Sequence, residues 1–302
     1  HVNDRVIHEH TLPINPDPWL ALHSFGQYAG ASRTIRILGQ PEIPTELRLS
    51  AREALGGWWA DMYGDPMNGE NAFWKKTGDE IVGVKLANWE GRSRESLLQY
   101  HRPLLEDGEI TYDYFYIPNQ TDVAPALGRM AMMLTPDGVK VHWLTDAQFE
   151  RGGLAPGNLT VEQDYRRGPA TLPLKANDWN HVGLALKGDL LTLAVNGETV
   201  YERPVSPDNL RTFGLFRFAG ESDARVKSVV YRGDWPRTLP SIKEQELAGN
   251  DAELASFKEG ELPAGFSWNF RDRMPGNLSP TGDIPTTTRN KWEHWLQITR
   301  AP

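Results

Sequence analysis

The sequence predicts an all-β protein built as an antiparallel sandwich, and residues 179–201 give the clearest evidence for it. Every second residue is apolar in residues 182–186 and again in residues 191–195, as half-buried strands require. Gly188-Asp189 provides a turn between these two segments. Asn196-Gly197 then supplies the positive φ angles of a two-residue type I′ turn. These residues therefore predict three consecutive antiparallel strands.

Further strand-like segments, separated by turn residues, lie on both sides of this one. They are Glu46 to Ser50, Ile81 to Leu86, Ser96 to Leu104, Glu109 to Tyr116, Arg129 to Leu134, Val139 to Leu144, Phe213 to Phe218 and Val226 to Arg232. We expect one hairpin across Glu106-Asp107-Gly108 and another across Thr135-Pro-Asp-Gly138.

The chain divides into three regions. Residues 1–40 are predicted to be an irregular, proline-broken arm that packs on the sandwich, and residues 41–236 form the sandwich itself. Residues 237–302 are predicted to be an extension with short helices, because capping-box sequences occur near its start. The expected anchors of this extension on the sandwich are Trp268, Trp292 and Trp295.

Composition excludes several classes of function. The net charge of −8 argues against a nucleic-acid partner, because phosphates require a basic surface. No run of about 18 apolar residues occurs, so the sequence predicts no membrane span. The chain has no cysteine, which excludes disulfides and thiolate metal sites.

Tryptophan is unusually frequent, with 11 in 302 residues. One interpretation is a tryptophan-rich core between two sheets. The other is that some indoles are platforms for sugar rings, because aromatic faces cover apolar sugar faces. The second interpretation points to a glycan-binding or glycan-cleaving protein.

Glu109 and Asp113 are the best candidates for catalytic carboxylates. Strand alternation places both on one face, but four residues of strand span about 13 Å. Glycosidases hold their two carboxylates about 5–9.5 Å apart, so these two alone do not form a hydrolytic pair. The alternative is a solvated strand face, or ion pairs with Arg102 or Arg129.

Gln99 and His101 share one face of their predicted strand, and His142 lies two strands later. We expect them to line a cleft together with Asp113, where they would bind sugar hydroxyls, or abstract a proton next to a carbonyl group as in a lyase. The alternative is that each histidine is an isolated surface or packing residue. Further expected binding residues are Arg102, Arg129, Trp58, Tyr63 and Trp143.

No metal site or cofactor is predicted. His1, His8 and His10 lack the spacing of a zinc site and are interpreted as chance. A structural calcium ion remains an option on class grounds. Its candidate ligands in one polar loop are Asp61, Asp65, Asn68, Glu70 and Asn71.

Five segments resemble the C-terminal concanavalin-A-like or laminin-G-like module of large uncharacterised planctomycete proteins. They are Trp58-Trp-Ala-Asp-Met-Tyr-Gly64, Gln99-Tyr-His-Arg-Pro-Leu104, His142-Trp-Leu-Thr-Asp146, Asn177-Asp-Trp-Asn180 and Tyr231-Arg-Gly-Asp-Trp-Pro236. The resemblance covers about residues 41–240. It implies a jelly-roll sandwich, a bacterial source and export, with the protein secreted, periplasmic or on the cell surface. It implies no catalytic residues.

The leading hypothesis is therefore an exported domain that binds a poly- or oligosaccharide in a cleft lined by aromatic and arginine side chains. The first alternative is a glycoside hydrolase, or a polysaccharide or keto-glycoside lyase, that uses the same cleft. The second is a structural interaction module of a larger surface protein. The sequence specifies neither the sugar nor the oligomeric state.

Overall fold

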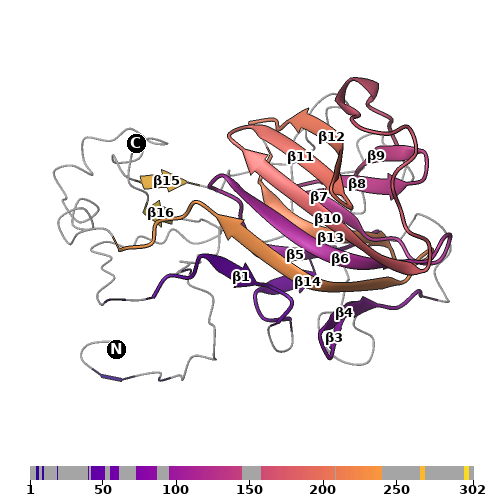
Figure 1. Ribbon diagram of the computed structural model, residues 1–302. Coiled ribbons are helices and arrows are strands. Elements are labelled where there is room, and N and C mark those ends of the chain that lie inside the picture. Colours follow the sequence, from indigo (N-terminus) through magenta and orange to yellow (C-terminus); the bar gives the residue numbers. More distant parts are fainter. Residues whose placement is uncertain are drawn as a thin grey trace.

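Two antiparallel sheets packed face to face contain most of the described strands (Figure 1). The computed structural model describes residues 5–6, 9, 19, 40, 42–51, 55–60, 73–86, 95–144, 158–207, 209–239, 266–268 and 296–298. These residues include no α-helix, and the 3-10 turn η3 lies at Gln163–Tyr165. The predicted all-β sandwich is thereby confirmed.

The larger sheet has eight strands, in the order β12-β11-β10-β6-β14-β4-β3, with β1 also paired to β14. These strands are β1 (Glu46–Arg48), β3 (Lys75–Thr77), β4 (Glu80–Gly83), β6 (Gly108–Tyr116), β10 (Asp178–Lys187), β11 (Leu190–Val195), β12 (Glu198–Pro204) and β14 (Ala224–Gly233).

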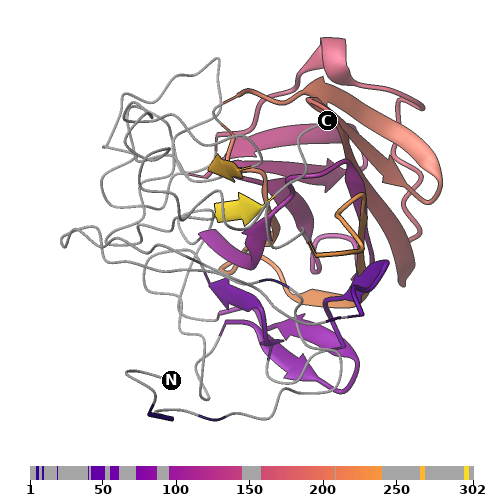
Figure 2. The same ribbon diagram turned by 90° about the vertical axis from the view of Figure 1, so that its left-hand side faces the viewer.

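The smaller sheet has six strands, in the order β2-β5-β13-β7-β8-β9. They are β2 (Trp58–Ala60), β5 (Glu95–Pro103), β7 (Ala124–Leu127), β8 (Met130–Thr135), β9 (Gly138–Trp143) and β13 (Thr212–Phe218). The view in Figure 2 shows the strands of the two sheets around a shared interior. A separate short pair joins β15 (Phe266–Trp268) and β16 (Leu296–Ile298).

The predicted run of three strands corresponds to β10, β11 and β12, which pair consecutively. Asn196 and Gly197 have φ angles of 50° and 87° at the turn between β11 and β12. Only residues that tolerate the left-handed region suit such a turn, which explains the Asn-Gly dipeptide. The predicted hairpin across Thr135–Gly138 is confirmed as β8–β9.

The predicted hairpin across Glu106-Asp107-Gly108 is wrong. Strand β5 pairs with β2 and β13 in the six-stranded sheet, whereas β6 pairs with β10 and β14 in the eight-stranded sheet. The chain passes from one sheet to the other at this turn. Its polar groups bond to neighbouring connections, with the Asp107 carboxylate accepting from Gly188 N at 2.6 Å.

The main core lies between the two sheets and contains inward-facing residues of both. Ile110, Tyr112 and Tyr114 of β6 are buried there, as are Val182 and Leu184 of β10. Because inward and outward positions alternate along a strand, the odd-numbered residues of β6 and β10 face away from this core.

The six-stranded sheet is strongly curled. Glu95 lies on β5 and His142 on β9, four strand positions apart, which is about 19 Å in a flat sheet. Their side chains nevertheless meet at 2.5 Å. A second buried cluster fills the inside of this curl and includes Leu97, Phe216 and Phe218.

Several predicted features lie wholly or largely outside the described residues: the arm 1–40, the helices after residue 240, and Trp292 and Trp295. Within the arm, Trp19 is described, and its Nε1 donates to the Tyr100 hydroxyl at 2.9 Å. Arg102 lies 3.6 Å from the centre of the Trp19 ring. The described part of the chain contains no helix with the length and hydrophobicity needed to cross a bilayer.

Candidate functional site

The residues predicted to line one cleft are divided between the two sheets. Gln99 and His101 lie on β5 and His142 on β9, all in the six-stranded sheet. Asp113 and Glu109 lie on β6 in the eight-stranded sheet. The prediction of a single face carrying Gln99, His101 and Asp113 is therefore wrong, because it depended on the pairing of β5 with β6.

The polar groups of the six-stranded sheet bond to one another. The Gln99 amide donates to Thr212 Oγ1 at 2.7 Å and accepts from Trp59 Nε1 at 3.1 Å. His142 is fully buried, with Nδ1 2.8 Å from the Asn158 carbonyl oxygen and Nε2 2.5 Å from Glu95 Oε1. These contacts make the network part of the curled sheet's interior.

The predicted border residues are also internal. Trp58 and Trp143 are 5% and 4% exposed and belong to the main core, so they are not open platforms. Arg102 is buried and pairs with Glu106 at 2.6 Å. Arg129 is buried and donates to the Leu144 carbonyl, so neither arginine is paired with Glu109. Tyr63 lies outside the described residues.

A different group of polar side chains lies in the open, on the outward face of the eight-stranded sheet. Asp113 of β6 lies between two cross-strand neighbours, His181 of β10 and Lys227 of β14. His181 Nδ1 donates to Asp113 Oδ1 at 2.8 Å, and the imidazole side chain is 54% exposed. In the tautomer that donates its Nδ1–H to Asp113, Nε2 of the imidazole is a hydrogen-bond acceptor.

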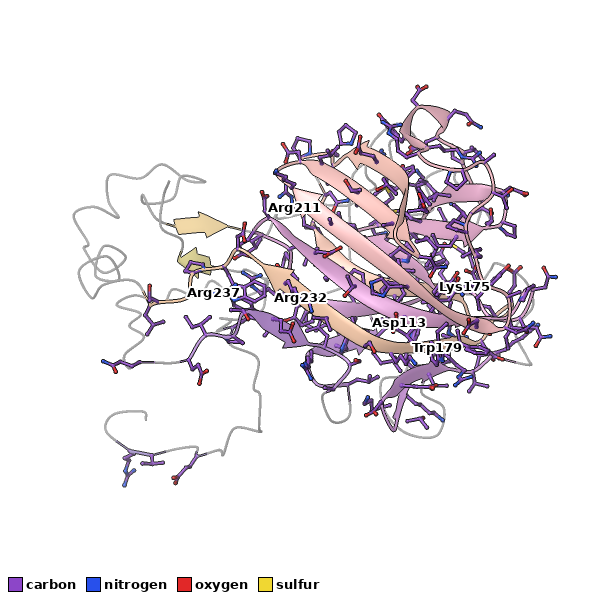
Figure 3. The ribbon with its side chains drawn as sticks, viewed as in Figure 1. Asp113, Lys175, Trp179, Arg211, Arg232 and Arg237 are labelled. Carbon is purple, nitrogen blue, oxygen red and sulfur yellow. The ribbon has the colours of Figure 1, made fainter. Side chains whose placement is uncertain are left out.

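Trp179 adds a partly exposed indole next to this group. It lies on β10 opposite Phe115, and the two rings meet edge to face with centres 5.3 Å apart. Lys227 Nζ is 4.0 Å from the centre of the indole. Figure 3 shows Trp179 and Asp113 near the same end of the sheet, with Lys175 close by. We call Phe115, Trp179, Asp113, His181 and Lys227 the Trp179 face.

A buried asparagine fixes the loop that leads into Trp179. The Asn180 amide nitrogen donates to the carbonyl groups of Lys175 and Asp178, at 2.9 and 3.0 Å. Its amide oxygen accepts from Lys175 N and from Asn196 Nδ2, at 2.7 and 2.8 Å. All four hydrogen-bonding positions of this amide are satisfied, which holds the start of β10 in one conformation.

An ion pair borders the Trp179 face. Arg225 of β14 donates Nε and Nη2 to the two oxygens of Glu80, at 2.9 and 2.8 Å. Its guanidinium carbon lies 4.8 Å from the Phe115 ring centre and 5.3 Å from that of Trp179. The hydrogen bonds from Arg225 lower the pKa of Glu80 and raise that of Arg225, so both groups are charged at neutral pH.

Sequence reasoning identified Asp113 but missed Trp179, His181, Lys227 and Arg225 as its neighbours. With Asp113 they lie on three strands that are distant in the sequence, and only the pairing of β6 with β10 and β14 joins them. In the sequence, the segment Asn177-Asp-Trp-Asn180 is distinguished only by its family resemblance. Within the described ranges no group of three or more histidine and acidic side chains is placed to hold a metal ion, and the polar loop of residues 61–71 lies outside those ranges.

Comparison with known families gives two matches. Residues 89–238 match a domain of unknown function (DUF1583_N), and residues 1–76 match a protein of unknown function (DUF1581). Both segments contribute strands to the same sandwich, because β1 pairs with β14 and β2 with β5. No curated protein is similar to the chain.

Solved structures with a similar arrangement of strands include three proteins. The carbohydrate binding module CBM66 from Bacillus subtilis is 16% identical, with 59% of this chain and 96% of that chain covered and a TM-score of 0.38. A putative glycosyl hydrolase from Parabacteroides distasonis is 14% identical, with coverages of 62% and 93% and a TM-score of 0.39. The VIP36 exoplasmic/lumenal domain is 12% identical, with coverages of 66% and 92% and a TM-score of 0.39. Similarity at this level carries no conclusion about ligand or activity.

Proposed function

We propose that this chain is a glycan-binding β-sandwich domain and that the Trp179 face is its binding surface. The observation that supports this is a partly exposed indole beside a hydrogen-bonded Asp113–His181 pair on the solvent-facing side of a sheet. An indole covers the apolar face of a sugar ring, and fixed polar groups beside it bond to the hydroxyls.

The polar groups of this face supply both partners that a hydroxyl requires. Asp113 accepts hydrogen bonds, His181 presents an acceptor at Nε2, and Lys227 donates. The hydrogen bond between Asp113 and His181 already orders these two side chains, so less conformational entropy is lost when they bind a ligand. The fully bonded Asn180 has the same effect on the loop before Trp179.

Binding to a panel of soluble polysaccharides, measured by affinity electrophoresis and calorimetry, tests the proposal. We expect the protein to bind at least one polysaccharide and Trp179→Ala to weaken that binding by about tenfold or more, since one stacked aromatic contributes about 1–3 kcal/mol. Val161→Ala is the control, because Val161 is 41% exposed and follows Thr160, which pairs with Val141 of β9 in the six-stranded sheet. Absence of binding to every polysaccharide would favour a structural interaction module instead.

A second candidate function is glycan cleavage at the same face, and the Asp113–His181 pair favours it. A carboxylate that orients an imidazole is the arrangement of many general bases. Analysis of reaction products after incubation with the bound polysaccharide distinguishes the two functions. If the protein is an enzyme, Asp113→Asn abolishes product formation while binding persists.

We also propose that the domain acts outside the cytoplasm, where polymeric glycans are found. The absence of cysteine from the sequence is compatible with an oxidising compartment. Fractionation of the source cells with an antibody to this chain tests the location, and recovery in the cytoplasmic fraction alone would contradict it.

A further inference from the structure

Positive and negative charges are balanced around Trp179. Of the two cations beside the indole, Arg225 is bonded through two nitrogens to Glu80, and Lys227 lies directly opposite Asp113 in the register of β14 and β6. The loop before Trp179 adds Lys175 and Asp178, one charge of each sign. The face therefore offers no excess of positive charge to an anionic ligand.

The charge of the whole chain acts in the same direction. Its net charge of −8 repels polyanions at long range. Salt screens that repulsion beyond about 8 Å at physiological ionic strength, so the local pairs decide which ligand is accepted at contact.

Glu80 determines whether the Arg225 guanidinium is available to a ligand. A guanidinium next to an aromatic platform is well suited to bind a sugar carboxylate through two parallel hydrogen bonds. Arg225 has that location, and its side chain is 42% exposed. Glu80 already occupies Nε and Nη2 of Arg225, the side-on pair of donors, and its negative charge repels a second carboxylate that approaches the remaining Nη1 side.

We propose that the Trp179 face selects uncharged glycans and that Glu80 is the specificity-determining residue, because it neutralises the Arg225 guanidinium and occupies the side-on pair of donors that would otherwise bind a uronic acid carboxylate. This inference rests on the proposed glycan-binding function. Neutral sugars bind through the indole and the Asp113–His181 pair, and neither contact depends on Arg225.

The test compares two classes of ligand on the wild type and on Glu80→Gln. The neutral probes are cellohexaose, xylohexaose and mannohexaose, and the acidic probe is hexagalacturonate, each titrated by calorimetry at about 0.05 M and about 0.5 M NaCl. We expect the wild type to bind a neutral probe with an affinity that salt leaves unchanged, and to bind hexagalacturonate at least about tenfold more weakly. Glu80→Gln should raise the affinity for hexagalacturonate by about tenfold in low salt and leave neutral binding unchanged.

Glu46→Gln is the matched control. Glu46 pairs with Arg232 at 2.8 Å on the same sheet, so this variant removes the same charge away from Trp179 and should not improve binding of the acidic probe. Preferential binding of hexagalacturonate by the wild type, or no gain in Glu80→Gln, overturns the specificity inference and leaves glycan binding intact. If none of the probes binds, or if Trp179→Ala binds them all as the wild type does, the proposed function fails as well.

Discussion

Two side-chain pairs in this protein each depend on the protonation of one carboxylate. They are His142–Glu95, which is buried, and Arg225–Glu80, which is partly exposed. At the first, His142 Nδ1 faces a carbonyl oxygen, which only accepts, so this nitrogen carries a proton. Its Nε2 lies 2.5 Å from Glu95 Oε1, and a second proton must lie between these atoms whichever group holds it. The pair therefore has no net charge, which is compatible with its burial inside the curled sheet.

Removing both members of this pair should cost less than the two single losses added together. Glu95→Leu leaves the buried imidazole without its partner, and we expect a loss of about 3 kcal/mol in the free energy of unfolding. The same loss is expected for His142→Phe. The double variant should recover at least about 1 kcal/mol relative to the sum of the single losses, as measured by urea denaturation. Additive losses would show that the two residues act independently.

The second site is the Glu80–Arg225 pair, which predicts a dependence of stability on pH. Arg225 holds the pKa of Glu80 below its ordinary value of 4.5. A carboxylate with a lowered pKa stabilises the folded state above the pKa of the unfolded chain, and this contribution disappears as the pH falls through the folded value.

Thermal melts of the wild type and Glu80→Gln test this dependence. Because Arg225 is 42% exposed, solvent screens the pair, and we expect the wild type to melt only about 1–2 °C higher at about pH 6. The difference should shrink as the pH falls below 4.5 and through the lowered pKa of Glu80, because the carboxylate is then protonated in both the folded and the unfolded protein. A difference that does not shrink as the pH falls would point to lost packing as its cause.

Individual elements show which structural features the sequence determines locally. The strands β10, β11 and β12 could be predicted because alternation and an Asn-Gly turn lie within 23 consecutive residues, Trp179 to Tyr201. The turn at residues 106–108 carries equally good local signals, yet it joins strands of different sheets. Alternation of apolar residues is the same for a strand in either sheet, so partner choice depends on contacts between distant segments.

The candidate site was predicted less completely for the same reason. Asp113 could be found from its strand, but its partners His181 and Lys227 are defined only by the pairing of β6 with β10 and β14. The burial of individual tryptophans could not be predicted from the sequence either. Residue type did not distinguish Trp58, which donates Nε1 to the Leu49 carbonyl at 2.9 Å inside the core, from the partly exposed Trp179.

The loop before β10 provides a prediction at this scale. Asn180→Ala removes four hydrogen bonds around a fully buried side chain. We expect the free energy of unfolding to fall by about 2–3 kcal/mol, and glycan affinity to fall because Trp179 is less firmly held. Asn177→Gly is the control, since its φ of 57° suits glycine. Glycan affinity unchanged in a folded Asn180→Ala protein would separate this network from the site.

The described sandwich has two outward faces that differ in their exposure to solvent. The outward face of the six-stranded sheet curls around its own buried cluster, so its polar residues bond to one another. The outward face of the eight-stranded sheet keeps Trp179 and His181 in contact with solvent. Strands from both matched segments of the chain complete these sheets, so we expect the surface to require residues from 1–76 as well as from 89–238.

The location of the glycan on the Trp179 face is the central claim, and indole NMR signals test it most directly. Each tryptophan gives one indole N–H signal, and Trp179→Phe identifies the signal of Trp179 by its absence. On titration with the polysaccharide that the protein binds, we predict that the Trp179 signal shifts in a saturable manner while those of the buried Trp58 and Trp74 remain in place. A saturable shift confined to other tryptophans, with Trp179 unmoved, would contradict the account.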